Sequence, residues 1–359
     1  MPSPEKLTAC VVGGGAGGQL SLKALAASDR FDLLAAADLR AEVRDALEAQ
    51  YPGLQMFPDH EAMFAACPTD VVCVSTYPPS HELVTLSALQ TLPDLKGLLV
   101  EKPLGHTAAS GRRILEAIRE RGLPLAVPHG LLTRRTPMEI IDRVQKGDIG
   151  DLKLVEIQCR GWDIINAGIH WLDFFVTLSG NEPMEHVLGI ADASTRTFRD
   201  SMQVETMAVM YAQTRSGIRV VMNTGDEVLV NEAGKVTLFR LVGTAGLIEF
   251  YGWENGYRIM NAEFPETSLQ KPEEFPITGH HRHLENMADQ AEQKRPDYSV
   301  AEASLLALEI CEGAYLSSRH RARVTFPVDQ WLPPQDDNDW QPGQPYNGVG
   351  GGRDGRQFG

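Results

Sequence analysis

The sequence predicts an α/β protein with a doubly wound parallel sheet at the N-terminus and a second α/β domain built on an open, mostly antiparallel sheet. Three observations support this: strand and helix signals alternate over the first third, a glycine-rich turn separates the first pair, and long β-like runs extend from Met202 to about Met260. Alternation at this spacing is typical of a parallel sheet with helices on both faces. The chain has 359 residues, which is longer than a single domain usually is, since single domains seldom exceed ~250 residues. Two domains are therefore expected.

The first third contains five apolar runs that predict strands, over residues 7–12, 31–38, 70–76, 96–103 and 123–130. Amphipathic or helix-forming stretches separate them, and the turn at YPPS and Pro103 mark strand ends. The order is that of a parallel sheet whose strands are joined by helical crossovers.

The rest of the chain predicts a helix over 136–150, a strand over 151–162, and then β-like runs separated by turns rich in Gly, Asn and Glu. Helices over 280–293 and 300–318 and a closing strand over 321–328 follow. We therefore expect domains over residues 1–128 and 129–330. The Pro- and Gly-rich tail, residues 331–359, has too few apolar residues for a core and predicts an arm or a disordered end.

Charge and hydropathy exclude several classes of partner. The formal net charge of −15 disfavours binding to nucleic acid, which depends on clustered cations that neutralise phosphates. No apolar run approaches the ~20 residues needed to span a bilayer, and the N-terminus has no hydrophobic signal core, so we expect a cytoplasmic protein without membrane contact.

The glycine turn fits the pattern G-x-G-x-x-G at Gly13, Gly15 and Gly18, between a strand and a helix. Such glycines provide a tight turn, close backbone approach to a pyrophosphate and close helix packing, and the phosphates rest on the helix N-terminus that begins near Ala16. Asp38 ends the next strand, where a carboxylate binds the ribose hydroxyls of NAD. Arg40 leaves NADP open, because a guanidinium can receive a 2′-phosphate. This context predicts a Rossmann domain that binds NAD.

Further motifs follow in order along the chain: the turn Thr76-Tyr77-Pro78-Pro79-Ser80-His81, then Glu101-Lys102-Pro103, Arg134-Arg135, and Gly168-Ile169-His170-Trp171-Leu172-Asp173. As an ordered set they resemble the glucose–fructose oxidoreductase, inositol dehydrogenase and MocA family, over almost the whole chain to about Pro327. The resemblance implies hydride transfer between a nicotinamide cofactor and a secondary hydroxyl of a sugar, polyol or related polyhydroxy compound.

The same resemblance implies roles for individual residues. Lys102 would lie beside the nicotinamide and favour loss of the hydroxyl proton, and His170 would remove that proton, as suits an imidazole. Asn166 stands where the family commonly has an aspartate, and an amide cannot relay a proton at neutral pH. The further cofactor-binding candidates are Thr76, Pro78, His81 and Glu101, and the substrate-binding candidates are His129, Arg134, Trp162, Asn166, His170 and His281.

Asn166 keeps one alternative function open, in which tightly bound NAD oxidises the substrate only transiently during glycoside cleavage or epimerisation. A non-catalytic sensor of NAD or sugar is a second alternative, which Lys102 and His170 disfavour.

The histidines at 280, 281 and 283 lack convincing metal-ligand spacing, so we expect no metal. Apolar residues on both faces of the runs at 204–214 and 217–225 predict a homo-oligomer, a dimer or tetramer, as the resemblance also implies.

Overall fold

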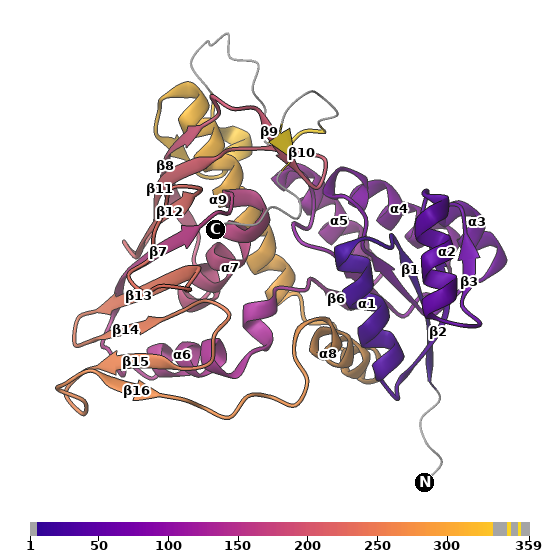
Figure 1. Ribbon diagram of the computed structural model, residues 1–359, viewed down its shortest axis with the longest axis horizontal. Coiled ribbons are helices and arrows are strands. Elements are labelled where there is room, and N and C mark those ends of the chain that lie inside the picture. Colours follow the sequence, from indigo (N-terminus) through magenta and orange to yellow (C-terminus); the bar gives the residue numbers. More distant parts are fainter. Residues whose placement is uncertain (1–5, 333–342, 346–350, 353–359) are drawn as a thin grey trace. The chain divides into compact units, whose positions relative to one another are not determined.

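A computed structural model describes residues 6–332, 343–345 and 351–352 (Figure 1). These residues form two compact units. The first comprises the described part of Met1–Gly130 together with Ile277–Glu302, and the second comprises Leu131–Pro276 with the described part of Ala303–Gly359. None of the helices in the described ranges is long and apolar enough to cross a membrane.

The first unit is built on a parallel sheet in the order β3-β2-β1-β4-β5-β6, which confirms the predicted doubly wound sheet. Its central strands are apolar and buried on both faces, as expected of a sheet covered by helices on each side. The sequence prediction missed β3, which has only three residues. The strands are β1 (Leu7–Val12), β2 (Phe31–Ala37), β3 (Gln55–Phe57), β4 (Val71–Val74), β5 (Gly97–Val100) and β6 (Leu125–Ala126).

Helices from both ends of the chain complete this unit. Leu22 of α1, Leu47 of α2 and Met287 of α8 share one hydrophobic cluster with β1, β4 and β5. Helix α8 therefore packs beside α1, although it follows the second sheet in sequence (Figure 1). The helices are α1 (Ala16–Ala27), α2 (Ala41–Gln50), α3 (His60–Ala66), α4 (His81–Thr91), α5 (Ala108–Glu120) and α8 (Gly279–Gln293), with a 3₁₀ turn η1 (Pro78–Ser80).

The second unit contains a mixed sheet in the order β16-β15-β14-β13-β7-β12-β11-β8-β17. Only the β12–β7 pair among these described strands is parallel, which confirms the predicted, mostly antiparallel sheet. Strand β8 was not predicted. The strands are β7 (Leu152–Arg160), β8 (Met184–Asp192), β11 (Met207–Thr214), β12 (Arg219–Gly225), β13 (Thr237–Gly243), β14 (Leu247–Phe250), β15 (Tyr257–Met260), β16 (Ser268–Gln270) and β17 (Val324–Thr325).

One face of this sheet is covered by helices and the other reaches solvent (Figure 1). Ile140 of α6, Phe174 of α7 and Leu308 of α9 join the buried residues of the sheet in one core. On the opposite face, Ile190 and Val209 pair across β8 and β11 and are 76% and 44% exposed. The covering elements are η2 (Gly130–Thr133), α6 (Arg135–Gln145), the π-helix η3 (Ile164–Gly168), α7 (Ile169–Leu178), the part of α9 (Ser299–His320) from Ala303 on, and η4 (Val328–Gln330).

A small sheet joins a hairpin to the C-terminal tail. The hairpin is β9 (Thr197–Arg199) with β10 (Met202–Val204), and β18 (Gly351–Gly352) pairs in parallel with β9. Pro345 forms a further bridge to Met202. The prediction of an arm or a disordered end for residues 331–359 otherwise lies outside the described residues.

Candidate functional site

The glycine turn of the first unit has the geometry that dinucleotide binding requires. Gly13 follows β1 with a φ of +97°, a left-handed value that favours glycine. A Cβ on Gly18 would lie 1.9 Å from the Gly13 carbonyl oxygen, so only glycine lets the helix pack this closely on the turn. A Cβ on Gly15 would meet no atom within 4 Å, which leaves open space at the N-terminus of α1, where Ala16 begins the helix. The turn therefore fits a pyrophosphate on the free N–H groups of the helix.

Asp38 lies beside the turn, with its two carboxylate oxygens already hydrogen-bonded. The Gly14 N–H donates to Oδ2 at 2.8 Å, and the Arg40 side chain donates to both oxygens at 3.1 and 3.2 Å. Burial opposes ionisation of Asp38, but these hydrogen bonds outweigh it and hold the pKa of the carboxyl below its ordinary value. The structure thus brings together the glycine turn, Asp38 and Arg40, as the sequence predicted, and adds a direct Asp38–Arg40 ion pair.

His81 joins the turns that follow β4 and β5. Its ring is fully buried, with Nε2 at 2.9 Å from the Thr76 carbonyl oxygen and Nδ1 at 3.0 Å from the Pro103 carbonyl oxygen. Burial lowers the pKa of His81. Thr76 Oγ1 accepts a hydrogen bond from Ser80 within the same turn, and Pro78 begins η1. These contacts give His81 a role in holding the loops; direct contact of these residues with the cofactor stays a prediction.

Glu101 and Lys102 follow β5. The Glu101 side chain lies against α1, where a Cβ on Gly17 would be 2.7 Å from its Oε1, and His280 Nε2 of α8 is 2.5 Å from the same oxygen. Burial raises the pKa of Glu101, but the His280 hydrogen bond and the nearby positive charge of Lys102 outweigh this effect and lower it. The catalytic role of Lys102 remains a prediction.

The neighbouring histidines of α8 have separate partners. His280 contacts Glu101, His281 Nε2 lies 3.4 Å from a Glu285 oxygen, and His283 Nε2 lies 3.2 Å from the His129 carbonyl oxygen. Burial lowers the pKa of His283 to about 4, and burial also lowers the pKa of His129 well below its usual value. Across the described residues, no group of three His, Cys, Asp or Glu side chains is arranged to hold a metal ion.

In the second unit, Asn166 lies on the π-helix η3, which runs directly into α7. Asp163 caps η3: its Oδ1 accepts from the Asn166 N–H at 2.7 Å, and Arg199 donates to its Oδ2 at 3.0 Å. Asn166 Nδ2 donates to Asp200. Asp163 is thus used for capping, and a different carboxylate, that of Asp200, reaches the Asn166 amide.

His170, the second residue of α7, lies beside an exposed tryptophan. Its ring centroid is 5.3 Å from that of Trp253, edge to face, and the Trp253 side chain is 41% exposed, whereas Trp171 is 1% exposed. Arg134 donates to the Trp253 carbonyl oxygen and to Glu274. Trp171 therefore acts as a packing anchor, and Trp253 is the partly exposed tryptophan beside His170.

Trp162, another predicted substrate-binding residue, is engaged within the protein. The Arg199 guanidinium lies 4.4 Å from its ring centroid, and its carbonyl oxygen accepts from Thr224 at 2.6 Å. The structure thus places Trp162 and Asn166 around the same Asp163–Arg199 pair, and His170 and Arg134 around Trp253.

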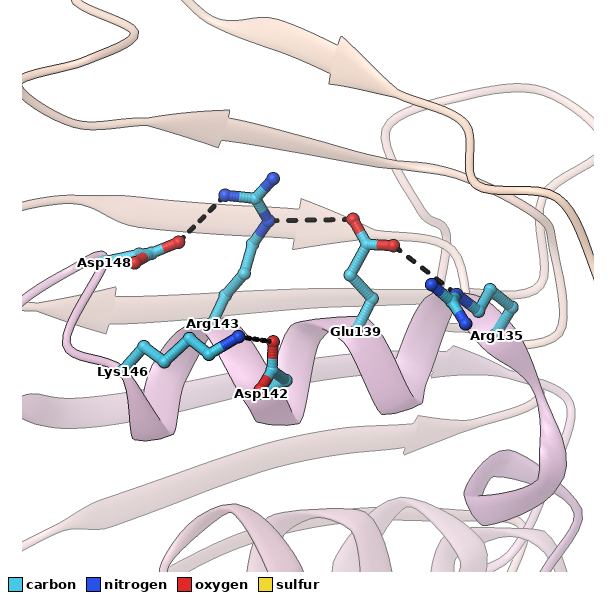
Figure 2. A pocket seen from close by; sticks show the side chains of 6 residues that line it. All are labelled: Arg135, Glu139, Asp142, Arg143, Lys146 and Asp148. Atoms are coloured by element: carbon cyan, nitrogen blue, oxygen red, sulfur yellow. Dashed lines mark hydrogen bonds and ion pairs between the residues drawn. The ribbon is translucent and has the colours of Figure 1, made fainter.

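A surface pocket along α6 contains none of the predicted site residues (Figure 2). Figure 2 shows its charged side chains as a row of ion pairs, including Arg143 with Asp148 at 2.8 Å and Lys146 with Asp142 at 2.6 Å. The Tyr257 hydroxyl of β15 donates to Glu139 at 2.6 Å. Because positive and negative groups alternate and contact each other, this row fastens α6 to β15 and does not provide a charged ligand site.

The sequence analysis missed Arg199, Asp200, Glu205 and Tyr315, all of which surround η3. They are 34 to 150 residues away from their partners in the chain, and no local motif marks them.

Comparison with known proteins agrees with this geometry. Residues 7–129 match the model of the oxidoreductase family with an NAD-binding Rossmann fold, GFO_IDH_MocA. The chain is 28% identical over 191 residues to the rhizopine catabolism protein MocA of Rhizobium meliloti, covering 48% of this chain and 57% of that protein. It is 28% identical over 186 residues to an inositol 2-dehydrogenase of Rubrobacter xylanophilus, covering 47% and 51%. The matches therefore span little more than half the length of these relatives.

A solved structure covers more of the chain. The WlbA dehydrogenase from Bordetella pertussis, in complex with NADH and UDP-GlcNAcA, aligns with a TM-score of 0.73 over 90% of this chain and 100% of that chain, at 20% identity. At this identity the likeness shows the fold. The first unit is thus an NAD-binding Rossmann domain, and residues 7–129 match that domain of the Gfo/Idh/MocA oxidoreductase family.

Proposed function

We propose that the protein is an NAD-dependent dehydrogenase that oxidises a secondary hydroxyl of a sugar, polyol or related polyhydroxy compound. The observation that supports this class of substrate is the contact of His170 with the partly exposed ring of Trp253. A tryptophan face suits the apolar C–H face of a cyclic polyhydroxy compound, and an imidazole beside it suits removal of a hydroxyl proton. The named relatives, an inositol dehydrogenase and a rhizopine catabolism protein, support the same class.

Each residue has a defined task in this proposal. A bound NAD would supply the hydride acceptor. The Lys102 ammonium would stabilise negative charge that develops on the reacting oxygen, and His170 would accept the hydroxyl proton. Asn166, held through Asp200, would hydrogen-bond a second hydroxyl and orient the substrate.

We also propose that NAD is the better cofactor and that NADP is accepted through Arg40. The buried Asp38 carboxylate supports NAD because it repels a 2′-phosphate. The Arg40 guanidinium, which is about half exposed, offers the phosphate a partner.

We further propose that the protein forms a dimer or tetramer through the open face of the second sheet. Ile190 and Val209 supply exposed apolar surface there.

The test is turnover of NAD with a panel of cyclic polyols, hexoses and glycosides, followed by the absorbance of NADH. We expect His170→Asn and Lys102→Met each to lower kcat/KM at least about 100-fold, the usual share of a proton-handling group. His186→Asn and Lys96→Met serve as matched controls, because these residues pair with Glu185 and Asp70 away from the candidate residues, and both should retain the wild-type rate.

Three outcomes would contradict the dehydrogenase proposal. Undiminished turnover in both His170→Asn and Lys102→Met would remove the catalytic assignment. Glycoside cleavage without net NADH, by protein that is purified with NAD bound, would favour the transient-oxidation alternative that Asn166 keeps open. Binding of NAD and a sugar without any turnover would favour a sensor.

A further inference from the structure

The π-helix η3 is surrounded by four buried polar side chains from separate parts of the second unit. Asp163 precedes η3, Arg199 ends β9, Glu205 follows β10, and Tyr315 lies on α9. Their exposed fractions are 0%, 6%, 1% and 3%. We refer to these four residues as the η3 cluster.

The η3 cluster satisfies consecutive backbone N–H groups of the π-helix. Glu205 Oε1 accepts from the Ile164 N–H at 2.7 Å, the Tyr315 hydroxyl oxygen accepts from the Ile165 N–H at 3.3 Å, and Asp163 accepts from the Asn166 N–H. The first N–H groups of any helix have no partner within the helix and require capping. One Ser or Asp usually caps a helix, whereas here three side chains fix three successive residues.

This arrangement is costly, which indicates that it serves more than capping. Two carboxylates, Asp163 and Glu205, are buried together, and the buried Arg199 donates a hydrogen bond to Asp163. Burial and the negative charge of Asp163 raise the pKa of Glu205 to about 7. The groups that face Glu205 are Asp163 and the Ile164 N–H on one side and, from α9, the Tyr315 hydroxyl, which donates at 2.6 Å, and the Cys311 thiol. Apolar packing would stabilise such a position at lower cost.

The β9–β10 hairpin, which lies beside η3, contains an unfavourable backbone conformation. Arg199 pairs with Met202, so Asp200 and Ser201 form a two-residue turn, with φ values of +47° and +59°. Such turns favour Asn-Gly because both central residues are left-handed. Here the turn residue Asp200 accepts a hydrogen bond from Asn166. Strained residues of this kind gather at functional sites, and π-helical turns do so as well.

We infer that Glu205 and Tyr315 are positioning residues, which fix the η3 turn and thereby the side chains of Asn166 and His170. The inference rests on the proposed function for the roles of Asn166 and His170. Glu205 anchors the first N–H of the turn, and Tyr315 bridges Glu205 to the second. Removal of either contact lets the turn relax toward an ordinary α-helical start and rotates Asn166 relative to His170, because the side-chain direction changes with each residue of a helix.

The first measurement is hydrogen–deuterium exchange of the segment 161–171 in the full chain without ligand. We expect Tyr315→Phe and Glu205→Gln to speed exchange at Ile164 and Ile165 roughly tenfold, as for loss of one buried hydrogen bond. Tyr257→Phe is the matched control, because it also removes a tyrosine–carboxylate hydrogen bond, to Glu139, which is partly buried and lies beside α6. Unchanged exchange at the turn in a folded Tyr315→Phe or Glu205→Gln protein would overturn the inference, as would faster exchange spread evenly over the second unit.

The second measurement separates positioning from general stability. In Glu205→Gln and Tyr315→Phe we expect kcat to fall roughly tenfold with the Kd for NADH unchanged, whereas Tyr257→Phe keeps both values. Faster exchange at the turn with unchanged kcat would overturn the positioning role and leave the proposed function intact. If His170→Asn retains wild-type turnover while Glu205→Gln and Tyr315→Phe show the expected faster exchange, the proposed function is contradicted. The anchoring of the η3 turn by Glu205 and Tyr315 then still stands. If Tyr315→Phe fails to fold, Glu205→Gln alone decides, because the amide keeps the size of the side chain but has one acceptor oxygen and cannot accept from both the Ile164 N–H and the Tyr315 hydroxyl.

Discussion

At the scale of single residues, we propose that Asp38 and Arg40 control the choice of cofactor. A carboxylate has about four acceptor positions, and the contacts from Gly14 and from the Arg40 backbone and side chain use four. A ribose hydroxyl must therefore displace the Arg40 side chain, which swings out readily because it is about half exposed. Once displaced, the guanidinium is available to a 2′-phosphate.

Arg40→Ala tests this competition. We expect tighter binding of NADH, because the Asp38 oxygens become accessible, and binding of NADPH that is weaker by roughly tenfold or more, because a charge-assisted hydrogen bond is lost. Fluorescence titration with each reduced cofactor measures both constants. Arg113→Ala is the control, since Arg113 is an exposed arginine of the same unit that pairs with Glu82. Equal changes for the two cofactors would show that Arg40 does not discriminate between them.

At the scale of elements, we expect two glycines of the glycine turn to differ in role, one in binding the cofactor and the other in packing the helix. Gly15 has a φ of −70°, which any residue adopts, and faces open space, whereas Gly18 touches the Gly13 carbonyl. The two positions therefore respond differently to the same added methyl group.

We expect Gly15→Ala to fold with an unchanged Tm and to bind NADH at least about tenfold more weakly, because its Cβ occupies the space that a pyrophosphate needs. Gly18→Ala should instead lower the free energy of unfolding by about 1–3 kcal/mol, the usual cost of overpacking, because the helix must move away from β1. Urea unfolding and cofactor titration of both variants measure these effects. A stable Gly18→Ala protein, or a Gly15→Ala protein with full affinity, would contradict the assignment.

At the scale of the whole molecule, one face of the second sheet is not covered by any helix among the described residues. Leu188, Ile190 and Val209 form an apolar strip on β8 and β11, while Glu156 and Arg240 on β7 and β13 form an ion pair on the same sheet. Contiguous exposed apolar residues are typical of interfaces between proteins.

Ile190→Glu is therefore expected to lower the mass observed by light scattering, because a charge inserted into an apolar interface must be desolvated. Leu229→Glu is the matched control: Leu229 is 73% exposed but lies outside the strands, and its change should leave the mass unaltered. A wild-type protein that is monomeric at micromolar concentration would remove the predicted oligomer.

Local patterns in the sequence determined the elements and the cofactor. Apolar runs bounded by turns predicted most strands, because burial on both faces of a parallel sheet leaves a continuous apolar signal. Gly13, Gly15, Gly18 and Asp38 identified the dinucleotide turn, since each requirement concerns residues close in the chain. The sequence patterns did not predict short or alternating strands such as β3 and β8, because the stability of these strands comes from their neighbours in the sheet.

Only the tertiary structure decided which distant side chains meet. It placed α8 beside α1, capped η3 with Glu205 and Tyr315, and brought Asp200 to Asn166 and Trp253 to His170. The physical reason is that these contacts join residues far apart in the chain, such as Ser28 and Glu285, which are 257 positions apart. Such contacts depend on how whole elements pack, and a sequence pattern carries information only about residues that share an element or a turn.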